Sequence, residues 1–416
     1  MNFDAIGLTG EFLREQPFTL AFLLIVLEIP RYTFSIVVLA LAQLRGSVAS
    51  PVSDFSVSAI VPAFNGADVL AHTIRSIFAD GIEDVIVVND GSTDNTPQCL
   101  AELQKVYPRL KVLHHQQRAG KSAAINHGAR YATGELLLVV DADTSVHRGA
   151  TARLASAFSD DSVGVATGNI IVANKACNLL TAIQSIEYLL SVSVGRGFLE
   201  HLGAVSCCSG AFSMFRRSVF ELIGGMNVGP GEDLEITLRL RQAGYQVRFV
   251  SDAIVETNVP QTPRSLIRQR CRWDRDALSI RVFMYQQMSL RFKGERLSDT
   301  LQRMDFILLE LIPTLVFPFY LTNLAITRSA DFWSLLAGFY VALLLVYVTN
   351  IALAFVAARR PPTILELIVF PLVPLYQGLI MKLVRFYAYT DEIIFARSHN
   401  DPFVPDRIRA ALYDGQ

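Results

Sequence analysis

The first half of the chain alternates short apolar runs with polar turns and helical periodicity, a pattern typical of an α/β domain. Four of these runs predict strands, at residues 57–61, 84–88, 111–113 and 135–140. The first, second and fourth end in turns rich in Gly, Asn or Asp. This pattern predicts a largely parallel sheet, which binds ligands beyond the carboxyl ends of its strands.

Four longer apolar segments lie toward the two ends of the chain, at residues 18–44, 306–327, 332–358 and 363–381. Each is long enough to cross a bilayer, and 332–358 contains no charged residue. Pro371 and Pro374 interrupt the last segment, which either crosses the membrane or re-enters it.

Charge and composition support a membrane protein with a cytoplasmic domain. Arg359 and Arg360 directly follow the uncharged segment, so the positive-inside tendency places them and residues 46–305 in the cytoplasm. Hydrophobic residues make up 51% of the chain, charged residues 18%, and the mean hydropathy is +0.36. The net charge of −1 argues against a general nucleic-acid binder, and the five cysteines show no zinc or redox spacing.

Two acidic turns follow predicted strands. Asp141 and Asp143, one residue apart, form a hard oxygen site suited to Mg²⁺ or Mn²⁺, unless the turn is merely solvated. Asp90 can accept hydrogen bonds from a nucleobase or ribose, or can make an Asx turn. Lys121, near the start of a predicted helix at 120–131, is placed to meet a diphosphate.

A third acidic pair, Glu232 and Asp233, begins a predicted helix at 232–242. Carboxylates in a first helical turn complement the helix dipole. One of them can instead deprotonate an acceptor hydroxyl. Spacing alone does not decide between these interpretations.

The segment 264–303 has ten Lys or Arg residues against four Asp or Glu, as expected for an amphipathic helix at a membrane surface. Gln269, Arg272 and Trp273 share one helical face. Arg272 can stabilise a leaving diphosphate, and Trp273 offers a flat surface to a sugar ring. A snorkelling Arg and an interfacial Trp are the structural alternative.

The order of these motifs resembles that of processive, inverting family 2 glycosyltransferases, which include cellulose, hyaluronan, poly-N-acetylglucosamine and rhizobial chitin-oligosaccharide synthases. The motifs that carry the resemblance are Asp90, Asp141-Ala142-Asp143, Gly231-Glu232-Asp233 and Gln269-Arg270-Cys271-Arg272-Trp273. The resemblance covers about residues 57–280 and the general membrane plan. It implies a GT-A fold, a UDP-sugar donor and a β-linked product.

By this resemblance, Asp233 is the general base and Arg272 stabilises the departing UDP. The nucleotide sugar would be bound by Asp90, which contacts the uridine, and by Lys121, Asp141 and Asp143. Asp143 would be the direct ligand of Mg²⁺ or Mn²⁺. The acceptor would be bound by residues from three motifs: Ser209, Gly210, Glu232, Gln269 and Trp273.

The hydropathy pattern and the resemblance together predict a division of the chain into five parts. These are a membrane anchor (1–46), a cytoplasmic GT-A domain (47–262), interfacial helices (263–304), transmembrane helices (305–385) and a tail (386–416). Asp274-Arg275-Asp276 follows Trp273 where related synthases often carry a small residue, so the acceptor entrance is expected to differ. The chain has fewer predicted membrane spans than cellulose synthase. We therefore expect an accessory export protein or a second protomer to help build the path by which the glycan leaves.

The leading hypothesis is therefore a multi-pass enzyme of the plasma (inner) membrane that extends a β-linked polysaccharide from a UDP-sugar. The alternative is a non-processive transferase with a lipid acceptor, since ceramide glucosyltransferases are similar around the Arg-Trp pair. A transporter with a degenerate nucleotide-binding domain is disfavoured because all the expected carboxylates are present. Membrane lipids are expected partners and nucleic acid is not, while the sugar and the linkage stay open.

Overall fold

The computed structural model describes residues 55–227, 231–284, 297–358 and 360–397. The predicted anchor at 18–44 and the end of the chain from residue 398 lie outside the described residues.

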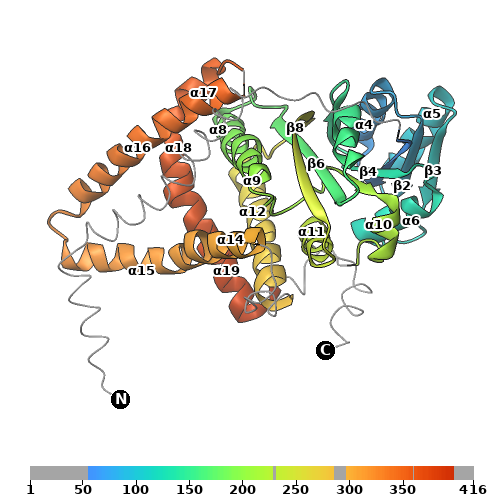
Figure 1. The fold of residues 1–416 in the computed structure, drawn as a ribbon. Coiled ribbons are helices and arrows are strands. Elements are labelled where there is room, and N and C mark those ends of the chain that lie inside the picture. The colour runs from blue at the N-terminus through green and yellow to red at the C-terminus, as the bar shows by residue number, and fades with distance from the viewer. Residues whose placement is uncertain (1–54, 228–230, 285–296, 359, 398–416) are drawn as a thin grey trace.

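A mixed sheet of eight strands, in the order β3-β2-β1-β4-β7-β6-β8-β5, forms the centre of the described N-terminal half (Figure 1). Its strands are β1 (Val57–Ala63), β2 (Asp84–Asn89), β3 (Leu110–His114), β4 (Leu136–Val140), β5 (Thr144–Val146), β6 (Val163–Val172), β7 (Phe212–Arg216) and β8 (Gln246–Thr257). The first four strands pair in parallel. β7 runs antiparallel to both β4 and β6, β8 pairs in parallel with β6, and β5 runs antiparallel to β8.

Helices cover both faces of this sheet. One face carries α4 (Ala67–Ala79), α5 (Thr96–Val106) and α7 (Ala150–Ala155). The other carries α6 (Lys121–Tyr131), α10 (Arg217–Leu222) and α11 (Glu232–Gln242). The resulting three layers make the α/β class predicted from the sequence.

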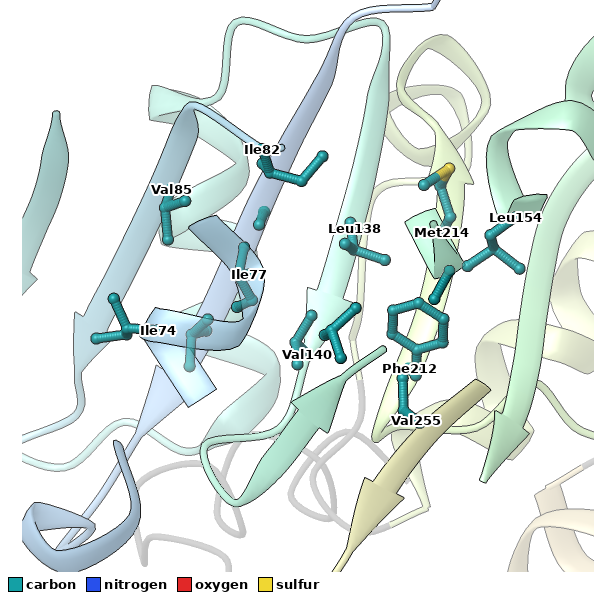
Figure 2. Packing of buried hydrophobic residues seen from close by; sticks show 14 of the residues in the cluster. Ile74, Ile77, Ile82, Val85, Leu138, Val140, Leu154, Phe212, Met214 and Val255 are labelled. Carbon is teal, nitrogen blue, oxygen red and sulfur yellow. The ribbon is translucent and has the colours of Figure 1, made fainter. Parts of the chain in front are cut away.

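The strands are apolar at consecutive positions because both of their faces are buried. In β4, Leu138 and Val140 point into the layer that contains Ile74 and Ile77 of α4 (Figure 2). Val139 belongs instead to the layer on the opposite face of the sheet. Because β1 pairs in parallel with both β2 and β4, the carboxyl ends of these three strands lie at one end of the sheet, where the predicted acidic turns follow β2 and β4.

A second group of helices joins the sheet to the C-terminal helices (Figure 1). It consists of α8 (Leu179–Tyr188), a π-helical segment (Leu189–Arg196), α9 (Gly197–His201) and α12 (Pro263–Leu278). The C-terminal helices are α14 (Leu297–Met304), α15 (Ile312–Thr327), α16 (Phe332–Ala357), α17 (Ile364–Val369), α18 (Val373–Leu375) and α19 (Met381–Phe395). Apolar residues of α8 pack with α16, α17 and α18 in one buried cluster.

Three helices among the described residues are long and apolar enough to cross a membrane: Leu297–Thr327, Phe332–Ala357 and Ile364–Phe395. The middle one matches the predicted segment 332–358 closely. The other two are longer than their predicted counterparts, because polar residues near their ends continue the helix. A short turn, in which Asp331 N–H donates to Arg328 O, joins the first two.

Candidate active site

Lys121, at the start of α6, joins three separate parts of the chain. Its Nζ lies 2.7 Å from Asp141 Oδ1, at the end of β4, and 2.9 Å from Glu232 Oε1, at the start of α11. It also donates to Gly210 O over 3.3 Å. The predicted nucleotide-side and acceptor-side residues therefore meet at one ammonium group.

Asp233 lies beside this ammonium group, in the first turn of α11. Its Oδ2 accepts from Gly210 N–H at 3.1 Å and its Oδ1 from Leu234 N–H at 2.8 Å. The helix begins at Gly231, which has a left-handed conformation (φ 68°) that a side chain would strain. Both oxygens of Asp233 are thus aimed by backbone groups, and the carboxylate is held in one orientation.

Glu232 and Asp233 are adjacent in sequence, and their pKa values are shifted in opposite directions. Burial raises the pKa of Asp233, and the Glu232 carboxylate raises it further. Burial also acts to raise the pKa of Glu232, but the Lys121 ammonium, a backbone hydrogen bond and the charge of Arg272 together hold that pKa below its usual range. Glu232 is therefore the ionised partner of Lys121, and Asp233 is the more basic carboxylate of the two.

The loop 207–211, which leads into β7, is held against α11 by the buried hydroxyl of Thr237. Thr237 Oγ1 accepts from Cys208 N–H at 2.9 Å and lies 2.6 Å from Asp233 O. Ser209 N–H donates to Thr167 Oγ1 of β6 at 3.0 Å. These contacts fix Ser209 and Gly210 relative to both the sheet and the Asp233 carboxylate.

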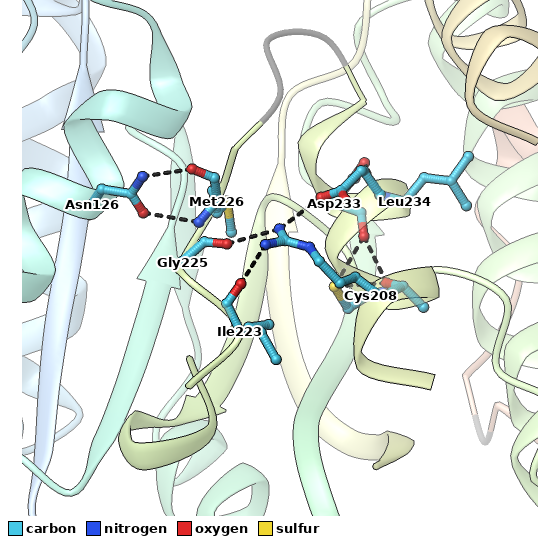
Figure 3. A network of polar contacts seen from close by, with 10 residues as sticks. Asn126, Cys208, Ile223, Gly225, Met226, Asp233 and Leu234 are labelled. Atoms are coloured by element: carbon cyan, nitrogen blue, oxygen red, sulfur yellow. Dashed lines mark hydrogen bonds and ion pairs between the residues drawn. The ribbon is translucent and has the colours of Figure 1, made fainter. Parts of the chain in front are cut away.

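The segment 223–226 ties α6 to α11. Asn126 of α6 makes two hydrogen bonds with the backbone of Met226 (Figure 3). Arg239 of α11 donates to Ile223 O at 2.7 Å and to Gly225 O at 2.8 Å. The helices that carry Lys121 and Asp233 are therefore clamped to the same piece of backbone.

Asp90 is buried and organises the loop that leads into α6. Its carboxylate accepts from Ala119 N–H and Gly120 N–H, each at 2.7 Å, and its Oδ1 lies 2.7 Å from His115 Nδ1. In the described structure Asp90 thus holds the backbone immediately before Lys121. Its predicted contact with a uridine stays a prediction.

The predicted acceptor residues Gln269, Arg272 and Trp273 all lie on α12. The positive charge of Arg272 is close enough to Glu232 to help lower the pKa of that carboxylate. Trp273 is 37% exposed, and the guanidinium carbon of Arg270 lies 4.6 Å from its ring centroid. Gln269 Oε1 is buried without a hydrogen-bond partner among the described atoms. The helix therefore contributes two charged groups and an accessible ring.

Residues 58–224 match the family model described as "Glycosyl transferase family 2". This stretch is therefore similar to a family 2 glycosyltransferase domain. The match includes Asp90, Lys121, Asp141, Asp143 and the 207–211 loop. The residues on α11 and α12 lie beyond the matched span, and their roles stay predictions.

Curated relatives are similar to the same region. An N-acetylglucosaminyltransferase of Bradyrhizobium diazoefficiens is 32% identical over 236 residues, which are 53% of this chain and 48% of the relative. A poly-beta-1,6-N-acetyl-D-glucosamine synthase of Staphylococcus aureus (strain MSSA476) is 29% identical over 218 residues, or 51% of this chain and 52% of that protein. The chain thus spans about half the length of these relatives.

A solved structure supports the architecture of the glycosyltransferase domain. The mannosyltransferase of Pyrobaculum calidifontis, in complex with GDP-Man and Mn²⁺, superposes with a TM-score of 0.61 at 20% identity. The match covers 84% of this chain and 97% of that one. Similarity at this level of identity concerns the fold, and it confirms the predicted GT-A class.

The Asp141-Ala142-Asp143 turn offers carboxylate oxygens, which are the ligand atoms that a divalent cation such as Mg²⁺ or Mn²⁺ binds in proteins. Asp143 is exposed, whereas Asp141 is already engaged by Lys121. Among the described residues, no group of three or more His, Cys, Asp or Glu is arranged to hold a metal ion. Water and diphosphate oxygens would therefore have to complete the coordination of Mg²⁺ or Mn²⁺, as Mg²⁺ prefers.

Sequence reasoning missed a pair beside Asp90 in the glycosyltransferase domain. The guanidinium of Arg118 lies 4.2 Å from the ring centroid of Phe64, which is 39% exposed. A Cβ at Gly91 would lie 2.7 Å from Arg118 N, so the loop after β2 and the loop before α6 are in close contact. The sequence features that could have revealed this pair are Phe64, in the turn after β1, and Arg118, three residues before Lys121. Phe64 and Arg118 stack on each other, so together they offer a flat surface to one side of a planar group.

Proposed function

We propose that this chain is a membrane-bound, inverting glycosyltransferase that moves a sugar from a UDP-sugar to the end of a growing β-linked glycan. The observation that carries the proposal is the Asp233 carboxylate, which is aimed by backbone groups and has a raised pKa. It stands beside the ammonium group of Lys121, which also contacts Asp141. A base, a cation and a nucleotide-side carboxylate at one place are what a single displacement at a sugar phosphate requires.

Asp233 would remove the proton from the acceptor hydroxyl as that oxygen attacks the anomeric carbon. The bond to the UDP oxygen breaks on the opposite face, so an α-linked donor gives a β-linked product. Lys121 and Arg272 would stabilise the negative charge that develops on the leaving diphosphate. A divalent cation, when bound by Asp143, would add charge stabilisation at the same diphosphate.

The nucleotide part of the UDP-sugar would be recognised by the loops that follow β1 and β2 and by the loop that precedes Lys121. Asp90 lies beside the stacked pair of Phe64 and Arg118, and this pair would stack against one face of a nucleobase. The first donor to test is UDP-N-acetylglucosamine, because relatives named for N-acetylglucosamine transfer match this region at 29–32% identity.

The acceptor would approach from the side of the membrane helices. Trp273 and Gln269 lie on α12, which carries ion pairs to the last candidate span, as between Arg385 Nε and Asp274 Oδ1 at 3.1 Å. A glycan end held there can continue toward the bilayer. The same position also favours a second candidate, in which a membrane lipid is the acceptor and a single sugar is transferred.

The test is sugar incorporation by the full chain in membranes or nanodiscs. Radiolabelled UDP-N-acetylglucosamine, UDP-glucose and UDP-glucuronate are supplied separately with Mg²⁺ or Mn²⁺, and the products are sized. A long polymer from one donor supports the synthase, and a small product that extracts into organic solvent supports the lipid acceptor. No incorporation from any UDP-sugar, by protein that is shown to be folded, would contradict both.

The Asp233→Asn variant tests the assigned base. It removes the proton acceptor with little change in shape, so incorporation should fall roughly 10²–10⁴-fold. Binding of UDP, measured by calorimetry, should stay within about two-fold of the parent protein because Asp233 is not assigned to the nucleotide. Retained activity in this variant would exclude Asp233 as the base.

A further inference from the structure

A buried polar cluster stands behind Trp273. Arg270 Nη2 donates to Glu187 Oε2 at 2.8 Å, and the hydroxyl of Tyr376 donates to the same oxygen at 2.9 Å. Glu187 belongs to α8, Arg270 to α12, and Tyr376 to the candidate membrane helix Ile364–Phe395. Three elements far apart in sequence thus share one carboxylate oxygen.

This cluster is largely shielded from water. The Arg270 and Glu187 side chains are 13% and 16% exposed, and Tyr376 is 3% exposed. A buried ion pair is weak evidence of a stabilising role, because the loss of solvation offsets much of the attraction. Its fixed geometry is the stronger clue, since each partner restricts the rotamers of the other two.

The geometry of Arg270 extends to Trp273. Its guanidinium lies over the indole ring, with 4.6 Å between the guanidinium carbon and the ring centroid. A planar cation held over an indole makes a favourable cation–π contact and covers one face of the ring. Trp273 nevertheless remains 37% exposed, so part of the ring is open to a ligand.

An aromatic platform binds a sugar more tightly when it is already fixed in the bound orientation, because less conformational entropy is lost on binding. Here the orientation would be set from behind, through Arg270, by a carboxylate on α8 and a hydroxyl on the last membrane helix. The proposed mechanism gives none of these three residues, Arg270, Glu187 and Tyr376, a contact with the reacting atoms.

We propose that Arg270, Glu187 and Tyr376 are positioning residues that hold the Trp273 indole as the platform for the acceptor sugar. They make acceptor binding depend on the seating of the last membrane helix against α8 and α12. The inference rests on the proposed function, in which Trp273 contacts the acceptor.

The test uses the full chain in nanodiscs and a soluble β-linked N-acetylglucosamine tetrasaccharide as the acceptor. Tyr376→Phe deletes one hydroxyl, so the KM for this acceptor should rise by up to about ten-fold, because a residue that acts through another transmits at most the free energy of the hydrogen bond it loses. Arg270→Met should raise it at least as much. The KM for the UDP-sugar should change less than about two-fold in both variants, because the donor is bound elsewhere.

A fluorescence measurement reads the ring directly and needs no turnover. The chain has two tryptophans, so Trp333→Phe leaves Trp273 as the sole indole emitter. In that background, Arg270→Met and Tyr376→Phe should increase acrylamide quenching of Trp273, because the covered face opens or the ring becomes mobile. Unchanged quenching in both variants overturns the inference.

Two matched controls separate this effect from general damage. Tyr340→Phe removes a membrane-helix hydroxyl that donates to Pro371 O instead, and Arg268→Met removes an exposed arginine of α12. Both should keep the parent acceptor KM and quenching. A change equal to that of Tyr376→Phe in either control would contradict a specific positioning role.

The outcomes distinguish the inference from the proposed function. If Trp273→Ala leaves the acceptor KM unchanged, the proposed acceptor site is wrong. If Trp273→Ala raises the acceptor KM but Tyr376→Phe and Arg270→Met do not, the acceptor site stands and the positioning role is overturned. If Arg270→Met fails to fold, Tyr376→Phe alone decides, because it deletes a single oxygen from a neutral side chain.

Discussion

The ammonium group of Lys121 contacts oxygens of Asp141, Glu232 and Gly210, so its position is set by three separate stretches of chain. An ammonium group on a flexible stem would otherwise sample many positions. The backbone of residue 210 passes close to it, with room for a hydrogen atom but not for a methyl group. A Cβ at Gly210 would lie 2.8 Å from Lys121 Nζ and 3.2 Å from Glu232 Oε1.

Gly210→Ala should therefore reduce activity without unfolding the protein. The added methyl displaces the mobile end of Lys121, and a misplacement of about 1 Å near reacting groups can lower kcat/KM roughly 10²-fold. The melting temperature should hardly change, since no backbone atom has to move. Gly338→Ala is the matched control, because the added Cβ would meet no described atom within 4 Å. A large loss of stability in Gly210→Ala would show that the loop itself had been distorted.

The pH dependence of turnover should report the raised pKa of Asp233. A general base works only when it is deprotonated, so activity is lost as the pH falls through this pKa. Burial, and then the Glu232 charge, raise that pKa above the usual aspartate value, so the acid limb should lie at a higher pH than for an exposed aspartate. The check is a profile of kcat/KM for the acceptor from about pH 5 to about pH 9.

The direction in which Glu232 shifts the pKa of Asp233 can be tested with Glu232→Gln. This change removes a neighbouring negative charge, so the pKa of Asp233 should fall and the acid limb should move to lower pH, whatever happens to the maximal rate. A limb that stays in place, or moves to higher pH, would contradict the assignment of that limb to Asp233.

At the scale of elements, α11 is the part whose placement matters most. Its first turn carries the acidic pair, and its second turn carries Thr237, which is fully buried. The Thr237 hydroxyl accepts from Cys208 N–H and lies within hydrogen-bond distance of Asp233 O. The helix is thereby held against the loop that contains Gly210.

Thr237→Val should destabilise the protein and slow turnover together. Valine keeps the shape but leaves the buried Cys208 N–H without its acceptor, which costs about 1–3 kcal/mol of unfolding free energy. The loop 207–211 should then shift relative to Asp233, which lowers kcat. Denaturation and kinetics of the same preparation measure both effects, and Thr237→Ser, which keeps the hydroxyl, is the control. Equal behaviour of the Val and Ser variants would show that the hydroxyl has no such role.

At the scale of the whole molecule, α12 is seated on the last candidate membrane helix by charges. Asp274 Oδ1 lies 3.1 Å from Arg385 Nε, and Arg275 Nε lies 3.3 Å from Asp391 Oδ2. The acidic and basic residues that follow Trp273 are expected to alter the acceptor entrance, and this stays a prediction. The structure pairs two of them, Asp274 and Arg275, with α19. They join the catalytic half of the molecule to its apolar helices.

Removing one charge of the Asp274–Arg385 pair should weaken this joint. Asp274→Asn and Arg385→Gln should each cost about 2 kcal/mol, less than for a fully buried pair because Arg385 is 32% exposed. The double variant should cost less than the sum of the two single variants, because neither charge is then left unpaired. Thermal unfolding in nanodiscs measures all three, and strictly additive losses would show that the two side chains do not interact.

Much of the fold follows from local pattern. The strands before residue 141 and the helix Glu232–Gln242 lie where alternation, turn residues and an acidic first turn predict them. β6, by contrast, was not predicted. It is buried on both faces and includes Gly168 and Thr167, and the Thr167 hydroxyl is satisfied by Phe212 O of a neighbouring strand. Such a strand shows no alternation of polar and apolar residues, because both of its faces are buried. Its polar atoms find hydrogen-bond partners only in the folded sheet.

The sequence by itself determined the residue types of the site, the α/β class, and the placement of the acidic turns at strand ends. These depend on periodicity and turn chemistry, which are local, whereas the GT-A class was implied by the resemblance to family 2 glycosyltransferases. Only the tertiary structure decided that Lys121 joins Asp141 to Glu232, and that Tyr376 meets Glu187 across 189 residues of chain. Such contacts depend on how layers and helices pack, and on which buried polar groups satisfy one another. That pairing leaves no periodic trace in the sequence.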